Sequence, residues 1–253
     1  MAADWTPLTR ELAIWRSDGM DLPIWWRDDD AVAPTPALDR IADLSDALRM
    51  PLHLAVIPAG ATGDLADYCA DRTGLIPLVH GWAHQNHAPE GAKKAEFGHP
   101  RPGLVTDAEK GLARLRALFG ETLVPVFVPP WNRISPDLLH ALAGLGYAAV
   151  STFTPRTHRM AAPGLVAINT HLDPIDWRGG GGIIAEDRLI ARTVALLEDR
   201  RAGRADPHEP LGLLTHHLVH DAAIWAFTER WLGVLLDAGA RPVALSDHRD
   251  ALP

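Results

Sequence analysis

The sequence predicts an α/β fold, and the arrangement we expect is one single-domain (β/α) barrel over residues 1–253. The chain of 253 residues, 47% of them hydrophobic, is long enough for one sizeable core. Short apolar runs alternate with helical patterns, which is typical of parallel strands joined by crossover helices. Polar side chains suited to catalysis or metal binding follow most of these runs. An open doubly wound sheet is the alternative, and no linker or repeat indicates a second domain.

Eight short apolar runs are the candidate strands of this barrel. Pro58 and Gly60 follow the second run and are typical of a strand end. The eight runs are Leu22–Trp26, Leu52–Ile57, Leu75–Val79, Val124–Val128, Ala148–Ser151, Leu165–Asn169, Leu211–Leu214 and Pro242–Leu245.

Capping signals and helical spacing of apolar residues mark the segments between the strands. Thr35 and Ser135 each precede a proline, which predicts two helix N-caps. Thr106 and Glu109 form the capping box T-x-x-E of a third helix. Residues 84–103 show no periodicity and predict a long loop, which in compact domains is often functional. Further helices are expected over Asp64–Arg72, Glu186–Arg201, Ala222–Asp237 and, as an N-terminal extension of the barrel, within residues 1–21.

Composition excludes several classes of partner. The net charge is -8 and no basic stripe is present, so nucleic acid is not an expected partner. Cys69 is the single cysteine, which rules out a disulfide within the chain and fits a reducing compartment. There is no basic and apolar leader and no run of roughly 18 apolar residues, so we expect no membrane association and a cytoplasmic protein.

Polar clusters follow the predicted strands, and active sites of α/β barrels lie at the C-terminal strand ends. We therefore expect these clusters to converge on one site. They are Arg27–Asp30, His80–His84 with Asn86 and His87, Pro129–Arg133, His171–Arg178, His216–Asp221 and Ser246–His248.

His80, His84 and one of the three consecutive aspartates Asp28, Asp29 and Asp30 are the candidate ligands of a divalent metal. Adjacent carboxylates repel one another, and a bound cation relieves that repulsion. The H-x-x-x-H spacing puts two imidazoles on one face of a helical turn. Two histidines and one carboxylate leave positions open for water and substrate, the pattern of a catalytic site. The alternative is that the aspartates form a solvated turn that caps the next helix.

Such a site predicts amide or ester hydrolysis. The metal polarises a carbonyl and lowers the pKa of water. A second carboxylate can remove the water's proton, and a histidine can protonate a leaving amine. Backbone N–H groups can stabilise the oxyanion.

These residues resemble the polysaccharide deacetylase (NodB-homology) family, carbohydrate esterase family four, over roughly Leu22 to His248. The resemblance implies a distorted or seven-stranded (β/α) barrel, a divalent metal (zinc first, cobalt or nickel as options) and removal of acetyl groups from N-acetyl sugars. It implies Asp29 as general base and Asp30 as metal ligand. Asp28 as base with Asp29 as ligand is the other register. His80 and His84 match the two metal histidines of the family.

Three further motifs carry the resemblance. The segment from Val128 to Trp131 is similar to the family's R-P-P-Y motif, which implies that the Trp131 backbone N–H helps form the oxyanion hole. Valine replaces the arginine that orients the base, and Arg27 or Arg133 are the candidates to replace it. In Leu214-Thr215-His216, similar to the L-x-H motif, His216 is the implied general acid.

His217 is the alternative to His216 as general acid. The segment Asp173-Pro174-Ile175-Asp176-Trp177 is similar to a D-x-x-D-W motif, and with Arg178 it contributes Asp176 and Trp177 to the expected substrate site. Gly81 stands where the family carries Ser or Thr, which implies a lost hydrogen bond in the segment between His80 and His84, called the metal loop below.

The expected function is a metal-dependent hydrolase that removes an acetyl or other acyl group from an N-acetylated sugar or a related small amide. Two alternatives remain open. The valine at Val128 is compatible with a metal-independent amide hydrolase of the same fold. Aromatic side chains in the motif loops, Trp82, Trp131 and Trp177, are compatible with a non-catalytic carbohydrate-binding barrel.

Overall fold

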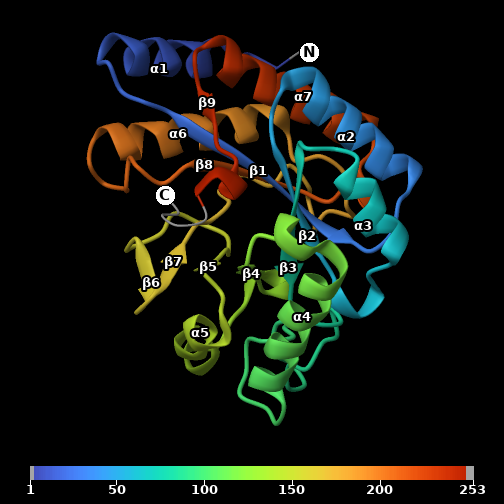
Figure 1. The fold of residues 1–253 in the computed structure, drawn as a ribbon. Coiled ribbons are helices and arrows are strands. Elements are labelled where there is room, and N and C mark those ends of the chain that lie inside the picture. Colours follow the sequence, from blue (N-terminus) through green and yellow to red (C-terminus); the bar gives the residue numbers. More distant parts are fainter. Residues whose placement is uncertain (1–2, 249–253) are drawn as a thin grey trace.

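A computed structural model describes residues 3–248, in which strands and helices alternate along the chain (Figure 1). The strands are β1 (Pro23–Ala31), β2 (Leu52–Val56), β3 (Leu75–His80), β4 (Val126–Val128), β5 (Ala149–Val150), β6 (Met160–Ala162), β7 (Leu165–Ala167), β8 (Leu211–Thr215) and β9 (Arg241–Pro242). The α-helices are α1 (Thr6–Ser17), α2 (Pro36–Leu48), α3 (Gly63–Ala70), α4 (Leu104–Phe119), α5 (Pro136–Leu142), α6 (Glu186–Arg201) and α7 (Ala222–Asp237).

The strands form one sheet that curves into a distorted barrel. Parallel pairing runs in the order β7-β5-β4-β3-β2-β1-β8, and β6 adds to β7 as an antiparallel edge. Strands β7 and β8 do not form a ladder, but the chain beyond β7 meets β8 at an isolated parallel bridge between Leu172 and Leu213. The expectation of a single α/β barrel is confirmed, and its distortion lies on the side of the short strands β4 to β7.

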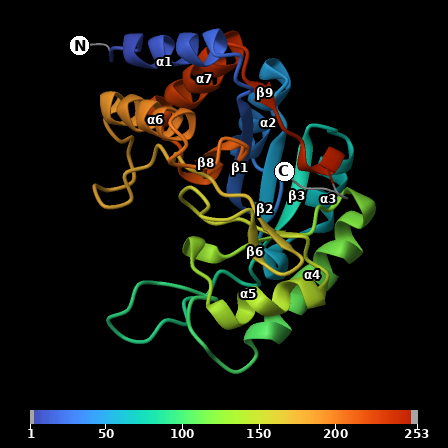
Figure 2. The same ribbon diagram turned by 90° about the vertical axis from the view of Figure 1, so that its left-hand side faces the viewer.

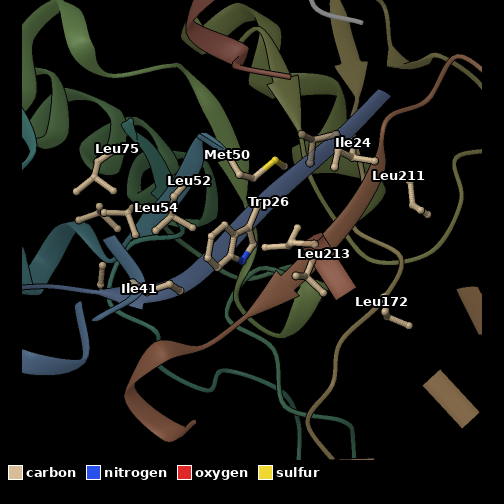
Figure 3. Packing of buried hydrophobic residues seen from close by; sticks show 14 of the residues in the cluster. Ile24, Trp26, Ile41, Met50, Leu52, Leu54, Leu75, Leu172, Leu211 and Leu213 are labelled. Atoms are coloured by element: carbon tan, nitrogen blue, oxygen red, sulfur yellow. The ribbon is translucent and has the colours of Figure 1, made fainter. Parts of the chain in front are cut away.

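Two hydrophobic layers flank the sheet because successive side chains of a strand point to opposite faces. Trp26 of β1 faces outward and packs with residues of β2 and β8 in the larger layer (Figure 3). Its neighbour Trp25 faces inward and joins a smaller inner cluster with Leu78 and Val128. Both indoles are fully buried and hydrogen-bonded, Trp25 to the Asn169 carbonyl and Trp26 to a threonine hydroxyl on β8, each at 2.9 Å. The same alternation continues into the polar end of β1.

Two of the three predicted helix N-caps are confirmed. The Thr35 hydroxyl accepts the first-turn N–H of α2 at 3.0 Å, and Ser135 does the same for α5 at 3.4 Å. The capping box at Thr106 is wrong, because α4 begins two residues earlier at Leu104. Gly103, with φ +79°, is the N-cap there, and the burial of Leu104 in the core stabilises the earlier start.

The last predicted strand is also mostly wrong. Only Arg241–Pro242 pairs, with the beginning of β1, and the chain then turns inward. Val243 and Leu245 enter the inner cluster, where the Leu245 N–H donates to His53 Nε2 at 3.0 Å. This segment closes the N-terminal end of the barrel, so the cluster Ser246–His248 lies at the opposite end from the other polar clusters.

Helix α1 packs against α6 on the outside of the barrel, and α7 lies beside them (Figures 1 and 2). The carboxylate of Glu11 accepts two hydrogen bonds from the Arg201 guanidinium, at 2.8 and 3.0 Å, and this ties α1 to α6. The loop between β3 and α4 extends away from the barrel in Figure 2, and its return segment contributes to the site. Among residues 3–248, no helix has the length and apolar character to span a bilayer.

Candidate active site

The C-terminal ends of the barrel strands open into a cavity of about 550 Å³. Strands β1, β3 and β8, the turn after β4, the loop between β7 and α6, and α6 itself all contribute to its lining. Eight of the nine predicted site residues line it: Asp29, Asp30, His80, His84, Trp131, Trp177, Arg178 and His216.

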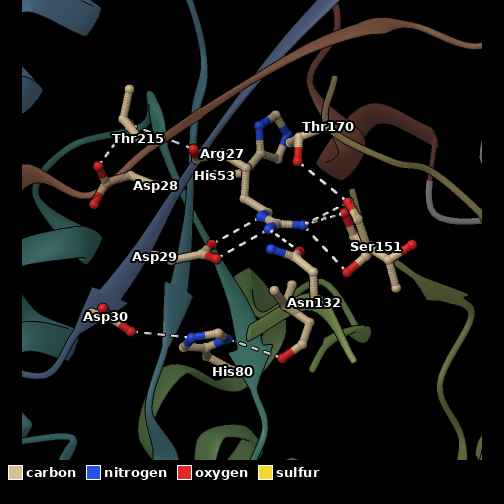
Figure 4. A network of polar contacts seen from close by, with 12 residues as sticks. Arg27, Asp28, Asp29, Asp30, His53, His80, Asn132, Ser151, Thr170 and Thr215 are labelled. Carbon is tan, nitrogen blue, oxygen red and sulfur yellow. Dashed lines mark hydrogen bonds and ion pairs between the residues drawn. The ribbon is translucent and has the colours of Figure 1, made fainter. Parts of the chain in front are cut away.

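Asp30, His80 and His84 form a trio with metal-binding chemistry. One ligand atom from each lies within 4.8 Å of the others. Asp30 Oδ1 is 3.1 Å from His80 Nε2 (Figure 4). It is 3.3 Å from His84 Nε2. His80 Nδ1 is 3.0 Å from the Val128 carbonyl, so a proton on Nδ1 leaves Nε2 with a lone pair directed at Asp30. A cation between these acceptors removes their repulsion, and the donor set therefore fits a divalent metal.

The electrostatics of the trio favour positive charge at this position. Burial opposes the ionisation of Asp30, but the hydrogen bond and charge of His80, with His216 and His84, outweigh it and lower the pKa of Asp30. Burial likewise disfavours a charged His80, but Asp29 and Asp30 raise its pKa overall. Burial and the neighbouring His80 lower the pKa of His84.

The two histidines do not share a helical turn, so that prediction is wrong. His80 is the last residue of β3, and left-handed backbone at Gly81 (φ +57°) and His84 (φ +54°) folds the chain back. A Cβ on Gly81 would lie 2.5 Å from the Glu96 carboxylate and 2.5 Å from the Pro130 ring, so no side chain fits there. The metal loop is thus shaped by backbone conformation and close packing.

Glu96 provides hydrogen bonds to the loop between His80 and His84, where the glycine at position 81 implies that a side-chain hydrogen bond is lost. This buried carboxylate comes from the long loop before α4. It accepts the backbone N–H groups of Trp82 at 3.2 Å, Ala83 at 2.8 Å and His84 at 3.2 Å. Three hydrogen bonds to this one carboxylate hold the loop that carries His84.

Arg27 and Asp29 form a buried ion pair beside the metal trio (Figure 4). They are two residues apart on β1 and therefore share its inward face. Arg27 donates to both Asp29 oxygens, at 2.8 and 3.0 Å, to the Asn132 side chain at 2.8 Å and to the Ser151 hydroxyl at 2.6 Å. Arg133, the other candidate to replace the family arginine, instead donates to a backbone carbonyl in the loop before α4.

Asp28 points to the opposite face of β1, away from the cavity. It accepts the Thr215 hydroxyl at 2.7 Å and the His217 backbone N–H at 2.9 Å, and it contacts the His217 ring nitrogen Nδ1. Burial opposes its ionisation, but the charge of His217 outweighs burial and lowers the pKa of Asp28. Neither Asp28 nor His217 lines the cavity, so the geometry favours Asp29 over Asp28 as base and His216 over His217 as acid.

The turn after β4 presents Trp131 to the metal loop. Trp131 (φ +57°) and Asn132 (φ +55°) both adopt left-handed backbone, as do Asp30 (φ +78°) and His84. Such conformations are uncommon outside glycine and are typical of functional sites. The Trp131 ring packs on the His84 imidazole with centroids 4.3 Å apart.

The loop between β7 and α6 closes the other side of the cavity. Asp173 accepts the Trp177 indole N–H at 2.8 Å, and the edge of Trp177 contacts the His216 ring at a centroid distance of 4.8 Å. Burial raises the pKa of Asp173, opposed by the charge of His216. Asp176 does not line the cavity, because its carboxylate accepts backbone N–H groups of its own loop, including that of Arg178. We therefore assign Asp176 to loop structure and not to substrate.

Three other histidines from the predicted clusters lie outside the cavity. His87 is exposed in the loop after the metal histidines. His171 is buried, with Nδ1 accepting a β8 N–H at 2.9 Å and Nε2 3.1 Å from Glu209. His220 packs edge-on against Trp225 at 4.5 Å.

Sequence reasoning missed two residues that build the site. Glu96 stands in a polar loop without periodicity, so nothing in the sequence separates it from a surface carboxylate. Asn132 belongs to a predicted cluster, but its hydrogen bond to Arg27 depends on the left-handed turn. The period-2 alternation of β1 is the signal that places Arg27 and Asp29 on one face.

No protein-family model matches the sequence, and no curated protein matches it either. Solved structures do share its fold. A peptidoglycan N-acetylglucosamine deacetylase is similar with a TM-score of 0.58 at 15% identity, over 90% of this chain and 87% of the other. A family 4 carbohydrate esterase from Streptomyces lividans, in complex with acetate, is similar with a TM-score of 0.54 at 13% identity, over 89% and 93%.

A mutant of a CE4-family pseudoenzyme with restored enzymatic activity is similar with a TM-score of 0.57 at 13% identity, over 91% of this chain and 68% of the other. At such identities the likeness establishes the fold alone. That fold is the one that the resemblance to polysaccharide deacetylases implied.

Proposed function

We propose that this chain is a metal-dependent hydrolase that removes an acetyl or other acyl group from an N-acylated sugar or a related small amide. The observation that carries the proposal is that two sets of groups meet at one cavity. One is the trio of Asp30, His80 and His84, and the other is Asp29 held by Arg27. The known proteins that share the fold include a deacetylase and an esterase bound to acetate, which supports the same chemistry.

Asp29 is the proposed general base. Arg27 fixes both of its oxygens by a bidentate contact in a fully buried position, so the carboxylate cannot rotate away from the cavity. In this orientation the carboxylate is placed to accept a proton from the attacking water.

His216 is the proposed general acid, and Trp131 supplies an oxyanion donor. His216 lines the same cavity as Asp29 and packs against Trp177, which limits the orientations of its ring. It can deliver a proton to the leaving nitrogen while the Trp131 backbone N–H donates to the developing oxyanion.

Asp30 and the Nε2 atoms of His80 and His84 would hold the cation, with zinc proposed first and cobalt or nickel as options. What a divalent cation supplies there is Lewis acidity, which polarises the acyl carbonyl and makes water a better nucleophile.

The test combines metal content with acetate release. We expect about one divalent metal per chain in the wild type by elemental analysis, and loss of both metal and acetate release from N-acetylglucosamine oligomers in His80→Ala/His84→Ala. The exposed His87, a histidine of the same loop outside the cavity, gives the matched control: His87→Ala should keep both. Unchanged metal content in the double variant would refute the metal assignment.

Activity must be measured directly, since one of the proteins sharing this fold derives from a pseudoenzyme. Acetate release that survives a strong chelator would favour the metal-independent hydrolase. Saturable sugar binding without metal or turnover would favour the carbohydrate-binding barrel. The valine at Val128 suggests a metal-independent reaction, but the contact of Arg27 with both Asp29 oxygens supports Arg27 as the replacement for the family arginine.

A further inference from the structure

Three arginines line the cavity in a protein that is acidic overall. Arg133 follows β4, Arg178 lies in the loop before α6, and Arg192 projects from the second turn of α6. The chain carries a net charge of -8, so this local excess of cations runs against its composition. Within residues 3–248, none of the three has a carboxylate oxygen within 4.0 Å of its guanidinium nitrogens.

The carboxylates of the same cavity already have other partners. Asp29 is paired with Arg27, and Asp30 contacts two imidazoles. Asp173 accepts the indole N–H of Trp177 and a backbone N–H of its own loop. The positive charge on the outer arginines is therefore not neutralised by direct contact within the described part of the chain.

Arg192 is held in place before any ligand arrives. Its guanidinium carbon lies 4.9 Å from the centre of the Phe153 ring, a cation–π contact that orients the group beside the cavity. Burial lowers the pKa of Arg192, and the charge of Asp173 opposes that effect. Arg192 is exposed, as Arg178 is, and a guanidinium held at the cavity wall without a direct carboxylate contact in the described residues can bind an anion by paired hydrogen bonds.

Arg178 is exposed but stands on a fixed loop. Asp176 accepts the backbone N–H groups of Arg178 and Gly179, at 3.2 and 2.9 Å. A Cβ on Gly179 would lie 2.3 Å from the Asp176 carboxylate, so this turn requires glycine. Arg133 is less available, because it already donates to the Lys94 carbonyl at 2.6 Å.

We propose that the substrate carries a carboxylate or phosphate group, which Arg178 and Arg192 bind while the acyl group lies at the Asp30, His80 and His84 end of the cavity. This inference rests on the proposed function and narrows it to anionic N-acyl compounds. Guanidinium groups recognise carboxylate and phosphate by paired hydrogen bonds, and two of them from separate elements select for an anion at a set distance from the reacting amide.

Binding to the purified protein by isothermal titration calorimetry tests the anion site without requiring turnover. The probes are N-acetylglucosamine, its 6-phosphate, N-acetylmuramic acid and inorganic phosphate. We expect at least one anionic sugar to bind tenfold or more tightly than the neutral sugar. Whichever of the two, the 6-phosphate or N-acetylmuramic acid, binds more tightly identifies the preferred anion as phosphate or carboxylate.

The variants are Arg178→Gln, Arg192→Gln and the double substitution, with Arg10→Gln on the exposed face of α1 as the matched control. The double variant should lose the tenfold preference and the binding of inorganic phosphate, and the control should keep both. A preference that survives in the double variant would overturn the proposal, since the anion would then bind elsewhere, for instance at a metal. Equal affinity for neutral and anionic sugars in the wild type would overturn it as well.

Acetate release separates this inference from the proposed function. If an anionic N-acetyl sugar is hydrolysed, the single variants should raise its KM at least tenfold, with the change falling on KM and not on kcat. If anion binding depends on the two arginines but no N-acyl compound is turned over, the proposed hydrolase fails while the anion site stands.

Discussion

Asp28 and Asp29 are adjacent in the sequence, yet they belong to two different environments. Asp29 faces the inside of the barrel, pairs with Arg27 and lines the cavity. Asp28 faces the helices, pairs with His217 and has no exposed surface. Each carboxylate has a basic partner on its own face, Arg27 for Asp29 and His217 for Asp28, so the repulsion expected of consecutive aspartates is relieved separately. Both carboxylates have an ion-pair partner, so access to the cavity is what distinguishes Asp29, the proposed base, from Asp28.

Replacing the inward carboxylate should have the largest effect. Asp29→Asn keeps the size of the side chain but removes the proposed base, so we expect kcat to fall by about 10² to 10⁴. Metal content should stay near the wild-type value, because Asp29 is not a member of the ligand trio. Steady-state kinetics and elemental analysis of the same sample check this, and full activity in the variant would remove Asp29 from the mechanism.

Replacing the outward carboxylate should act on stability. Asp28→Asn leaves a buried His217 without its counter-charge, and breaking one partner of a buried pair costs about 3 to 5 kcal/mol. We expect the free energy of unfolding to fall by roughly that amount in a denaturant titration. The kcat of the remaining folded enzyme should change far less than in Asp29→Asn. The opposite pattern, with kcat lost and stability kept, would reverse the roles assigned to the two residues.

His53, on the neighbouring strand β2, extends the comparison, because it is buried and has no ion pair with any residue of the described range 3–248. Its Nδ1 donates to the Trp26 carbonyl and its Nε2 accepts the Leu245 N–H. Burial lowers the pKa of His53 to about 4, opposed by the Trp26 hydrogen bond and the charge of Asp247. The unfolded chain therefore takes up this proton first, and stability is lost as pH falls from about 6.5 towards 4.

The expected loss from His53 alone is at most about 3 kcal/mol across that range. Unfolding titrations at several pH values should show a shallower acid dependence in His53→Gln than in the wild type. Some dependence should remain, because burial also lowers the pKa of His220 to about 4. Identical pH profiles for the two proteins would mean that His53 is not the responsible group.

Much of the fold followed from local patterns, and the errors lie where tertiary contacts override them. Alternation and capping located β1 to β3, α2 and α5, since these signals act within a few residues. The triple aspartate continues β1 and does not form a turn. Asp28 and Asp30 find partners on other elements, and Asp29 pairs with Arg27 of the same strand. The C-terminal run near Leu245 is apolar and predicts a strand, but it fills the inner core at the closed end of the barrel.

The candidate site was predictable as a set of residue types and less so as a set of contacts. The metal trio could be named from spacing and resemblance, and the structure brings it together. The sequence does not decide whether Arg27 or Arg133 replaces the family arginine. That choice depends on how β1 lies relative to the turn after β4. Glu96 lies twelve residues from His84 in a loop without periodicity, so its contact with the metal loop could not be read from the sequence.

Left-handed backbone at four residues of the site has a consequence for how this protein can change over evolutionary time. Asp30, His84, Trp131 and Asn132 all line the cavity and all have positive φ. Each such residue costs about 1 to 3 kcal/mol relative to relaxed backbone. Selection for heat resistance alone would favour relaxing these positions and would erode the geometry of the cavity, so thermostable variants that remain active should carry their stabilising substitutions on the helices and at the closed end of the barrel.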